Sequence, residues 1–281
     1  MKYLLIAFIL ITSVAYSQIP LPEMSPTARV VEEVGYTKIN IRYGRPSARK
    51  RKIMGEVVPY NRLWRTGAGP CTTISFSTPV EISNKNIAAG SYAFITTPGE
   101  KEWTVFLNSD TTKIYGDPSE YNVDTEITSF KVIPVKTDRF YESLTISIDI
   151  NKYDATLYLS WENTQISFPI KTRSYERSVA EIKKYLATNP TDPEMYALAA
   201  WFYYMNNDDS QQALTWIDKG LAMGDNRWLY SLRFDVLERM KNYAEARKTA
   251  DRAIAFMKRA KPVEWEDTVV SYEERVKKLP R

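Results

Sequence analysis

The sequence predicts a chain of two domains, an N-terminal all-β sandwich-like domain and a C-terminal all-α domain of helical hairpins. Apolar residues alternate with period two as far as Ile170, and they recur at helical spacing after Ser174. A length of 281 residues is enough for about two domains. We therefore expect a leader at residues 1–17, the β domain at 18–171 and the helical domain at 172–281.

The segment 1–17 is typical of a secretory signal peptide. Lys2 supplies a positive charge, the mostly apolar stretch Tyr3–Val14 follows, and small residues stand three and one positions before a predicted cut ahead of Gln18. A helix of that stretch would span only about 18 Å, short of the ~30 Å hydrocarbon core of a membrane. We expect an exported protein, periplasmic or extracellular after cleavage, with no transmembrane segment in the mature chain.

Period-two alternation defines the predicted strands of the β domain. In Thr37–Tyr43, for example, Ile39 and Ile41 alternate with Lys38 and Asn40. Further strands are predicted at Val30–Val34, Thr72–Ser77, Tyr92–Thr96, Trp103–Leu107, Ile127–Val135, Leu144–Ile150, Leu157–Trp161 and Ile166–Ile170. Many short alternating strands separated by glycine and proline turns predict a sandwich or a barrel.

Helical spacing begins near Ser174, and a weak repeat runs through the helices that follow. They are predicted at 193–206, 209–222, 226–240, 243–260 and 266–279. Ala213 and Gly220 recur 33 residues later as Ala246 and Ala253, and small residues at such positions allow two helices to approach closely. The spacing resembles that of tetratricopeptide repeats, which are about 34 residues long.

Composition excludes several classes of site. The chain has no histidine and a single cysteine, so that histidine-dependent triads, His-containing zinc sites and an intrachain disulfide are all excluded. The net charge of +4 is spread over both domains, which does not indicate a nucleic-acid partner. The polar turn Asn206–Asp209 lacks the residue order of a calcium loop. We expect no metal site and no cofactor.

Long, ordered motifs run through the predicted β domain. They are Ile41-Arg42-Tyr43-Gly44-Arg45-Pro46, Arg51-Lys52-Ile53-Met54-Gly55, Leu63-Trp64-Arg65-Thr66-Gly67-Ala68, Ala89-Gly90-Ser91-Tyr92-Ala93-Phe94 and Glu102-Trp103-Thr104-Val105. Over about residues 25–171 the chain resembles the bacterial domain of unknown function 2911 family. The resemblance implies an exported protein of Gram-negative bacteria and no known activity, so that it assigns no catalytic residue. One departure is Gly69-Pro70-Cys71, where the family often has Asn-Glu-Ala.

The segment from Arg42 to Arg65 is rich in arginine and forms a long connection between two predicted strands. Guanidinium groups bind carboxylate or phosphate in two-pronged fashion. One hypothesis is a site for an anionic small molecule or an acidic glycan, with Arg45, Arg62 and Arg65 as donors and Trp64 as a stacking wall. The alternative is a solvated basic loop in which Trp64 fills the core and Arg65 pairs with an internal acid.

Three function hypotheses follow. The first, which we favour, is a non-enzymatic binding module of the cell envelope whose helical repeats contact a protein partner. The second is an envelope hydrolase that cleaves glycans with two carboxylates of the β domain. Its candidate acids are Glu56, Glu102, Asp117, Glu120, Asp124 and Glu162. The third is a purely structural component of a larger envelope assembly.

Overall fold

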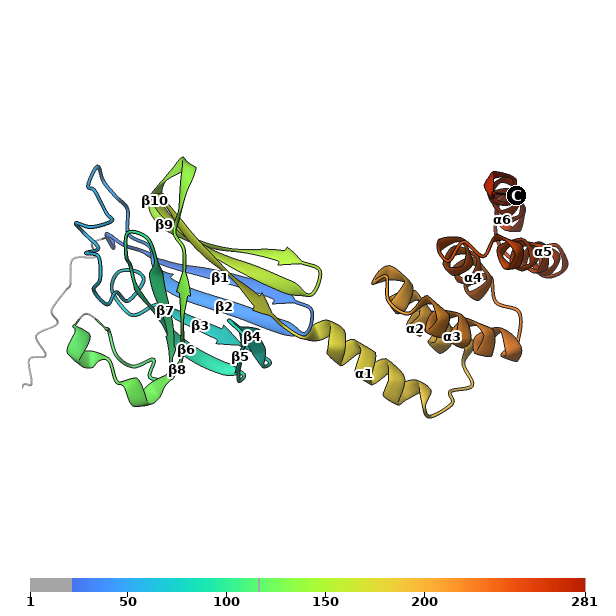
Figure 1. Ribbon diagram of the computed structural model, residues 1–281, viewed down its shortest axis with the longest axis horizontal. Coiled ribbons are helices and arrows are strands. Elements are labelled where there is room, and N and C mark those ends of the chain that lie inside the picture. The colour runs from blue at the N-terminus through green and yellow to red at the C-terminus, as the bar shows by residue number, and fades with distance from the viewer. Residues whose placement is uncertain (1–21, 116, 281) are drawn as a thin grey trace, which may run out of the picture. The chain divides into compact units, whose positions relative to one another are not determined.

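The structure is a computed structural model that describes residues 22–115 and 117–280 (Figure 1). The predicted leader at 1–17 lies outside these residues. The chain divides into two compact units, one that ends at Ser174 and one that begins at Tyr175. The first unit holds the strands and the second the long helices, which confirms the predicted fold class of a β domain followed by a helical domain.

Two antiparallel sheets make up the β unit. The six-stranded sheet has the order β1 (Thr27–Val34), β2 (Thr37–Gly44), β3 (Thr73–Phe76), β6 (Gly90–Thr97), β7 (Trp103–Asn108) and β8 (Glu126–Val132). The four-stranded sheet has the order β5 (Lys85–Ile87), β4 (Val80–Ile82), β10 (Asp154–Lys171) and β9 (Val135–Asn151). Two 3₁₀ turns, Pro118–Glu120 and Val123–Thr125, precede β8.

One apolar core joins the two sheets. Ile39 and Ile41 of β2 are fully buried in it. Lys38, which alternates with them in the same strand, points to the other face and is exposed. Phe94 of the six-stranded sheet meets Phe168 of the four-stranded sheet with ring centroids 6.0 Å apart. Side chains of both inner faces thus fill a common interior, as in a sandwich.

Two features of the four-stranded sheet differ from the sequence prediction. Leu157–Trp161 and Ile166–Ile170, predicted as separate strands, belong to the single strand β10, whose register shifts on both sides of Glu162. The short hairpin of β4 and β5 was not predicted. Strands of three residues are too short to show a period.

A small second cluster lies on the other face of β6 and β7, where Cys71, Ala93, Ile95 and Tyr115 are buried. Burial raises the pKa of the Cys71 thiol to about 12. The thiol therefore stays protonated at ordinary pH, and the reactive thiolate is not formed there. Cys71 is a small packing residue of this cluster.

The helical unit contains α1 (Ser174–Leu186), α2 (Pro193–Met205), α3 (Ser210–Met223), α4 (Arg227–Arg239), α5 (Tyr243–Ala260) and α6 (Trp265–Lys278). Asp192 caps α2 by accepting a hydrogen bond from the Glu194 amide, with Pro193 at the first helical position. A Cβ on Gly220 would lie 2.7 Å from a methyl group of Leu229, so that the missing side chain lets α3 and α4 approach. None of the helices in the described ranges is both long and apolar enough to cross a membrane.

Candidate functional site

Trp64, predicted as a stacking wall, packs against the main core of the β unit. Its ring stacks on Trp161 at 6.0 Å and meets Trp103 edge-on at 6.3 Å. Its indole N–H donates to the main-chain oxygen of Gly67 at 3.1 Å. We call these three side chains the three-indole cluster. Trp64 thus fills space between the sheets, as the alternative interpretation of this segment has it.

The three predicted arginine donors have separate surroundings. Arg45 donates to the main-chain oxygen of Leu144 at 3.1 Å and to Thr145 Oγ1 at 3.3 Å, so that it ties its loop to β9. Arg65 donates to a main-chain oxygen of its own loop at 2.8 Å. Arg62 is exposed. Neither these arginines nor Trp64 lines the cavity described next.

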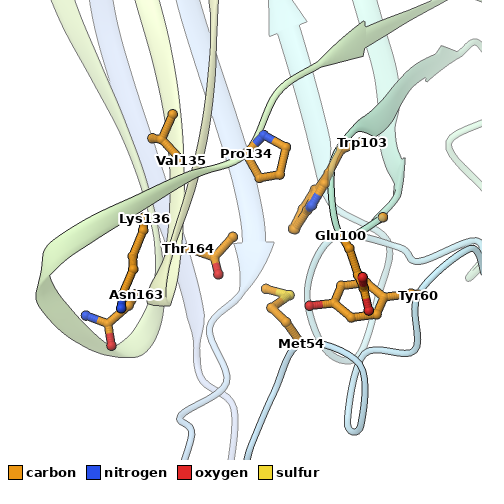
Figure 2. A pocket seen from close by; sticks show the side chains of 10 residues that line it. Met54, Tyr60, Glu100, Trp103, Pro134, Val135, Lys136, Asn163 and Thr164 are labelled. Carbon is orange, nitrogen blue, oxygen red and sulfur yellow. The ribbon is translucent and has the colours of Figure 1, made fainter.

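The β unit contains a cavity of about 320 Å³ (Figure 2). We call it the bulge cavity, after the bulge between β9 and β10 that is described below. Four segments that are distant in the sequence line the cavity. They contribute Met54 and Tyr60, then Gly99, Glu100 and Trp103, then Pro134, Val135 and Lys136, and finally Asn163 and Thr164. The volume lies in the range of small-molecule sites in proteins.

A large bulge between β9 and β10 shapes one side of this cavity. Glu162 pairs with Tyr141 and Thr164 with Lys136, so that the four residues 137–140 of β9 lie opposite the single residue Asn163 of β10. The Asn163 side chain donates to the main-chain oxygen of Thr137 at 3.0 Å and holds the excursion in place. Bulges of this kind occur often beside functional sites, where they redirect side chains.

The carboxylate of Glu162 fixes the opposite wall of the bulge cavity. It accepts hydrogen bonds from the Ile53 amide at 3.0 Å and from the Met54 amide at 3.3 Å. Glu162 itself has a positive φ of 51°, a conformation forced by the bulge. The loop that carries Met54 is therefore attached to β10 by an acceptor that bears a full charge.

Trp103 is the most deeply placed side chain of the bulge cavity, with 1% of its surface exposed. Figure 2 shows it reaching into the space between Pro134 and Thr164 on one side and Met54 and Tyr60 on the other. Within residues 22–115 and 117–280, the indole N–H of Trp103 donates to no protein acceptor. The indole nitrogen of Trp103 retains accessible surface, and because Trp103 lines the cavity, the nitrogen is reachable from it.

Charged groups lie only at the rim. Lys136 and Glu100 are both exposed, and neither has an ion-pair partner in the described part of the chain. Glu100 is the one carboxylate among the lining residues. The candidate acids Glu56 and Glu102 instead pair with Lys52 and Lys131, respectively. This arrangement lacks the two facing carboxylates on which most glycosidases depend.

The sequence did not predict the bulge cavity, although Trp103 belongs to the motif Glu102-Trp103-Thr104-Val105. Alternation marks Trp103 as an inward residue of a strand, and an inward tryptophan is most often a core residue. The signal that could have indicated the cavity is the polar run Glu162–Gln165 inside an otherwise apolar strand. Such a run interrupts the alternation and indicates an irregular ladder.

A search of curated proteins found no match. The family model described as "Protein of unknown function (DUF2911)" matches residues 25–170, which is more than half of the chain. The match stops before the helices, and the tetratricopeptide-like assignment of the helical unit stays a prediction. Over its β unit, the chain belongs to the DUF2911 family.

Proposed function

We propose that this protein is an exported, non-enzymatic binding module whose β unit takes a small molecule in the bulge cavity and whose helical unit contacts a protein partner. One observation carries the first part: the Trp103 indole N–H is free of protein acceptors and reachable at the bottom of a cavity of about 320 Å³. A ligand acceptor that enters the cavity would pair with this N–H.

The lining of the bulge cavity indicates the kind of ligand. Met54, Pro134 and Val135 offer apolar surface, and Tyr60 adds an aromatic ring. A suitable ligand has an apolar or ring-shaped body and one hydrogen-bond acceptor that meets the indole N–H. A single carboxylate in the lining favours binding over glycan hydrolysis.

Replacing Trp103 by Phe tests the binding proposal. The change keeps an aromatic ring and removes the N–H, so that we expect binding to weaken about 3- to 10-fold, the value of one neutral hydrogen bond. The probes are monocyclic fragments with one carbonyl or ether oxygen, screened by ligand-observed NMR. Trp228→Phe, at an exposed position of α4, is the matched control. Fragments that bind equally to both variants and to the natural chain would contradict the proposal.

The second part of the proposal rests on an apolar stripe of α2. Leu198, Trp201 and Met205 follow one another at helical spacing and are 49%, 41% and 53% exposed, respectively. A helix of a globular protein normally buries such a stripe, and exposed contiguous apolar surface marks interaction sites. We assign the partner to the class of proteins because flat apolar helix faces suit other helices or sheets.

A photo-crosslinking amino acid at position 201 tests the stripe, with position 219 on the exposed side of α3 as control. We expect a discrete crosslinked product from position 201 and none from 219, because only the former lies in the apolar stripe. Equal products from both positions would argue against it. The crosslinking experiment uses the full chain.

Export is tested separately by cell fractionation. We expect a mature form that begins at Gln18 in the periplasmic fraction.

A further inference from the structure

Two arginines lie side by side on the outer face of the six-stranded sheet. Arg29 of β1 is directly opposite Arg42 of β2 in the antiparallel ladder, and both side chains are exposed. Residues directly opposite each other point to the same face, so that the two guanidinium groups share one patch of surface. β1, β2 and β3 run next to one another in the sheet (Figure 1).

No acid neutralises this pair within the described residues. Neither arginine has a carboxylate within ion-pair distance, and the nearest cation along the ladder, Lys38, lies opposite Glu33. The Nε of Arg29 donates to Asn40 Oδ1 at 2.6 Å, which leaves its two terminal nitrogens free. The guanidinium group of Arg42 has no hydrogen bond to another described residue. Like charges directly opposite destabilise a sheet, and a bound anion would reverse that effect.

A depression of about 370 Å³ adjoins Arg29, and three serines are among its lining residues. Its lining includes Arg29 of β1, Ser75 of β3, Ser77 just after β3, and Ser91 of β6. The Ser77 hydroxyl accepts from a main-chain amide at 2.8 Å and can still donate its own proton. Ser91 has no hydrogen-bond partner in the described part of the chain. Donors and acceptors are thus available beside the two cations.

We infer that this face binds a sulfate or phosphate ester carried by a hydroxyl-rich molecule such as a sugar. Arg29 and Arg42 hold the tetrahedral oxyanion from two sides, since guanidinium forks match its oxygens in pairs. The serine hydroxyls of the depression bind the hydroxyl groups of the carrier. The site is separate from the bulge cavity, and its residues come from β1, β2, β3, the residue after β3, and β6.

Titration calorimetry of the full chain tests this assignment with glucose 6-sulfate, glucose 6-phosphate, inorganic sulfate and glucose as probes. We expect both esters to bind, inorganic sulfate to bind more weakly, and glucose not to bind. Arg29→Gln and Arg42→Gln should each weaken the esters by about tenfold or more, the usual loss for a charge-assisted hydrogen bond. Lys85→Gln, which removes the same charge from an exposed strand residue of the other sheet, should leave the affinity unchanged.

Failure of both esters to bind would overturn the inference. An equal loss in Lys85→Gln would also overturn it, because the attraction would then be general and not local. Melting curves add a check on the empty site. In dilute buffer without the esters, Arg42→Gln should melt no lower than the natural chain, since the change relieves repulsion. The ester should raise the melting temperature of the natural chain only. Trp103→Phe should bind the esters normally, which separates this site from the proposed function.

Discussion

Replacing Gly44 by Ala should destabilise the β unit by more than about 4 kcal/mol, or prevent it from folding. A Cβ at position 44 would lie 1.8 Å from the main-chain oxygen of Ala68, and a backbone group cannot rotate away as a side chain can. The Ala68 amide also donates to the Gly44 oxygen at 3.3 Å, so that the clash would break the contact between β2 and this loop. Urea unfolding followed by circular dichroism measures the loss.

Gly69→Ala, at the residue that directly follows Ala68, is the control for this prediction. Gly69 has a φ of +71°, but no heavy atom lies within 4 Å of a Cβ placed on it. We expect a loss of only about 1–2 kcal/mol from the left-handed backbone. Equal losses in the two variants would show that backbone conformation, and not the close approach of Ala68, constrains Gly44.

Trp161→Ala should cost about 3–5 kcal/mol, the usual range for removing a buried tryptophan. Trp161 is 2% exposed, stacks on Trp64 and donates its indole N–H to the Glu142 oxygen at 3.3 Å. Its loss would leave a void in the three-indole cluster and remove one of the two hydrogen bonds that the Glu142 carbonyl accepts, the other coming from the Ala48 amide at 2.7 Å. The shift of the urea midpoint of the β unit, at unchanged slope, gives the free energy.

Trp228→Ala, at a site that is 38% exposed on α4, serves as the comparison for Trp161. We expect it to leave the transition of the β unit unchanged, because the two residues belong to different compact units. A Trp161→Ala loss of less than about 1 kcal/mol would mean that the cluster does not support the core as described.

Strand and helix positions were largely predictable because burial on one face imposes a period. Ile39 and Ile41 alternate with charged or polar residues, and the prediction of β2 follows from that alone. The strand β10 was divided wrongly at Glu162–Gln165, since a polar run inside a strand looks like a turn. Only the ladder shows that β9 absorbs the irregularity by placing four residues opposite the single residue Asn163.

The candidate sites were less predictable because they depend on pairing between distant segments. The density of arginines between Arg42 and Arg65 carries no information on partners, and Arg45 in fact contacts β9, about 100 residues away. Arg29 and Arg42 become neighbours only once the register of β1 and β2 is known. The bulge cavity likewise needs four segments to meet, and no local pattern predicts that meeting.

The three-indole cluster also gives the β unit a distinctive optical signature. Aromatic chromophores held about 6 Å apart in fixed orientation couple their electronic transitions, and the resulting near-ultraviolet ellipticity exists only while the sandwich is closed. Trp103 belongs both to the cluster and to the lining of the bulge cavity. A ligand bound in that cavity would therefore change the near-ultraviolet ellipticity. The protein therefore contains an intrinsic reporter of occupancy that requires no added dye.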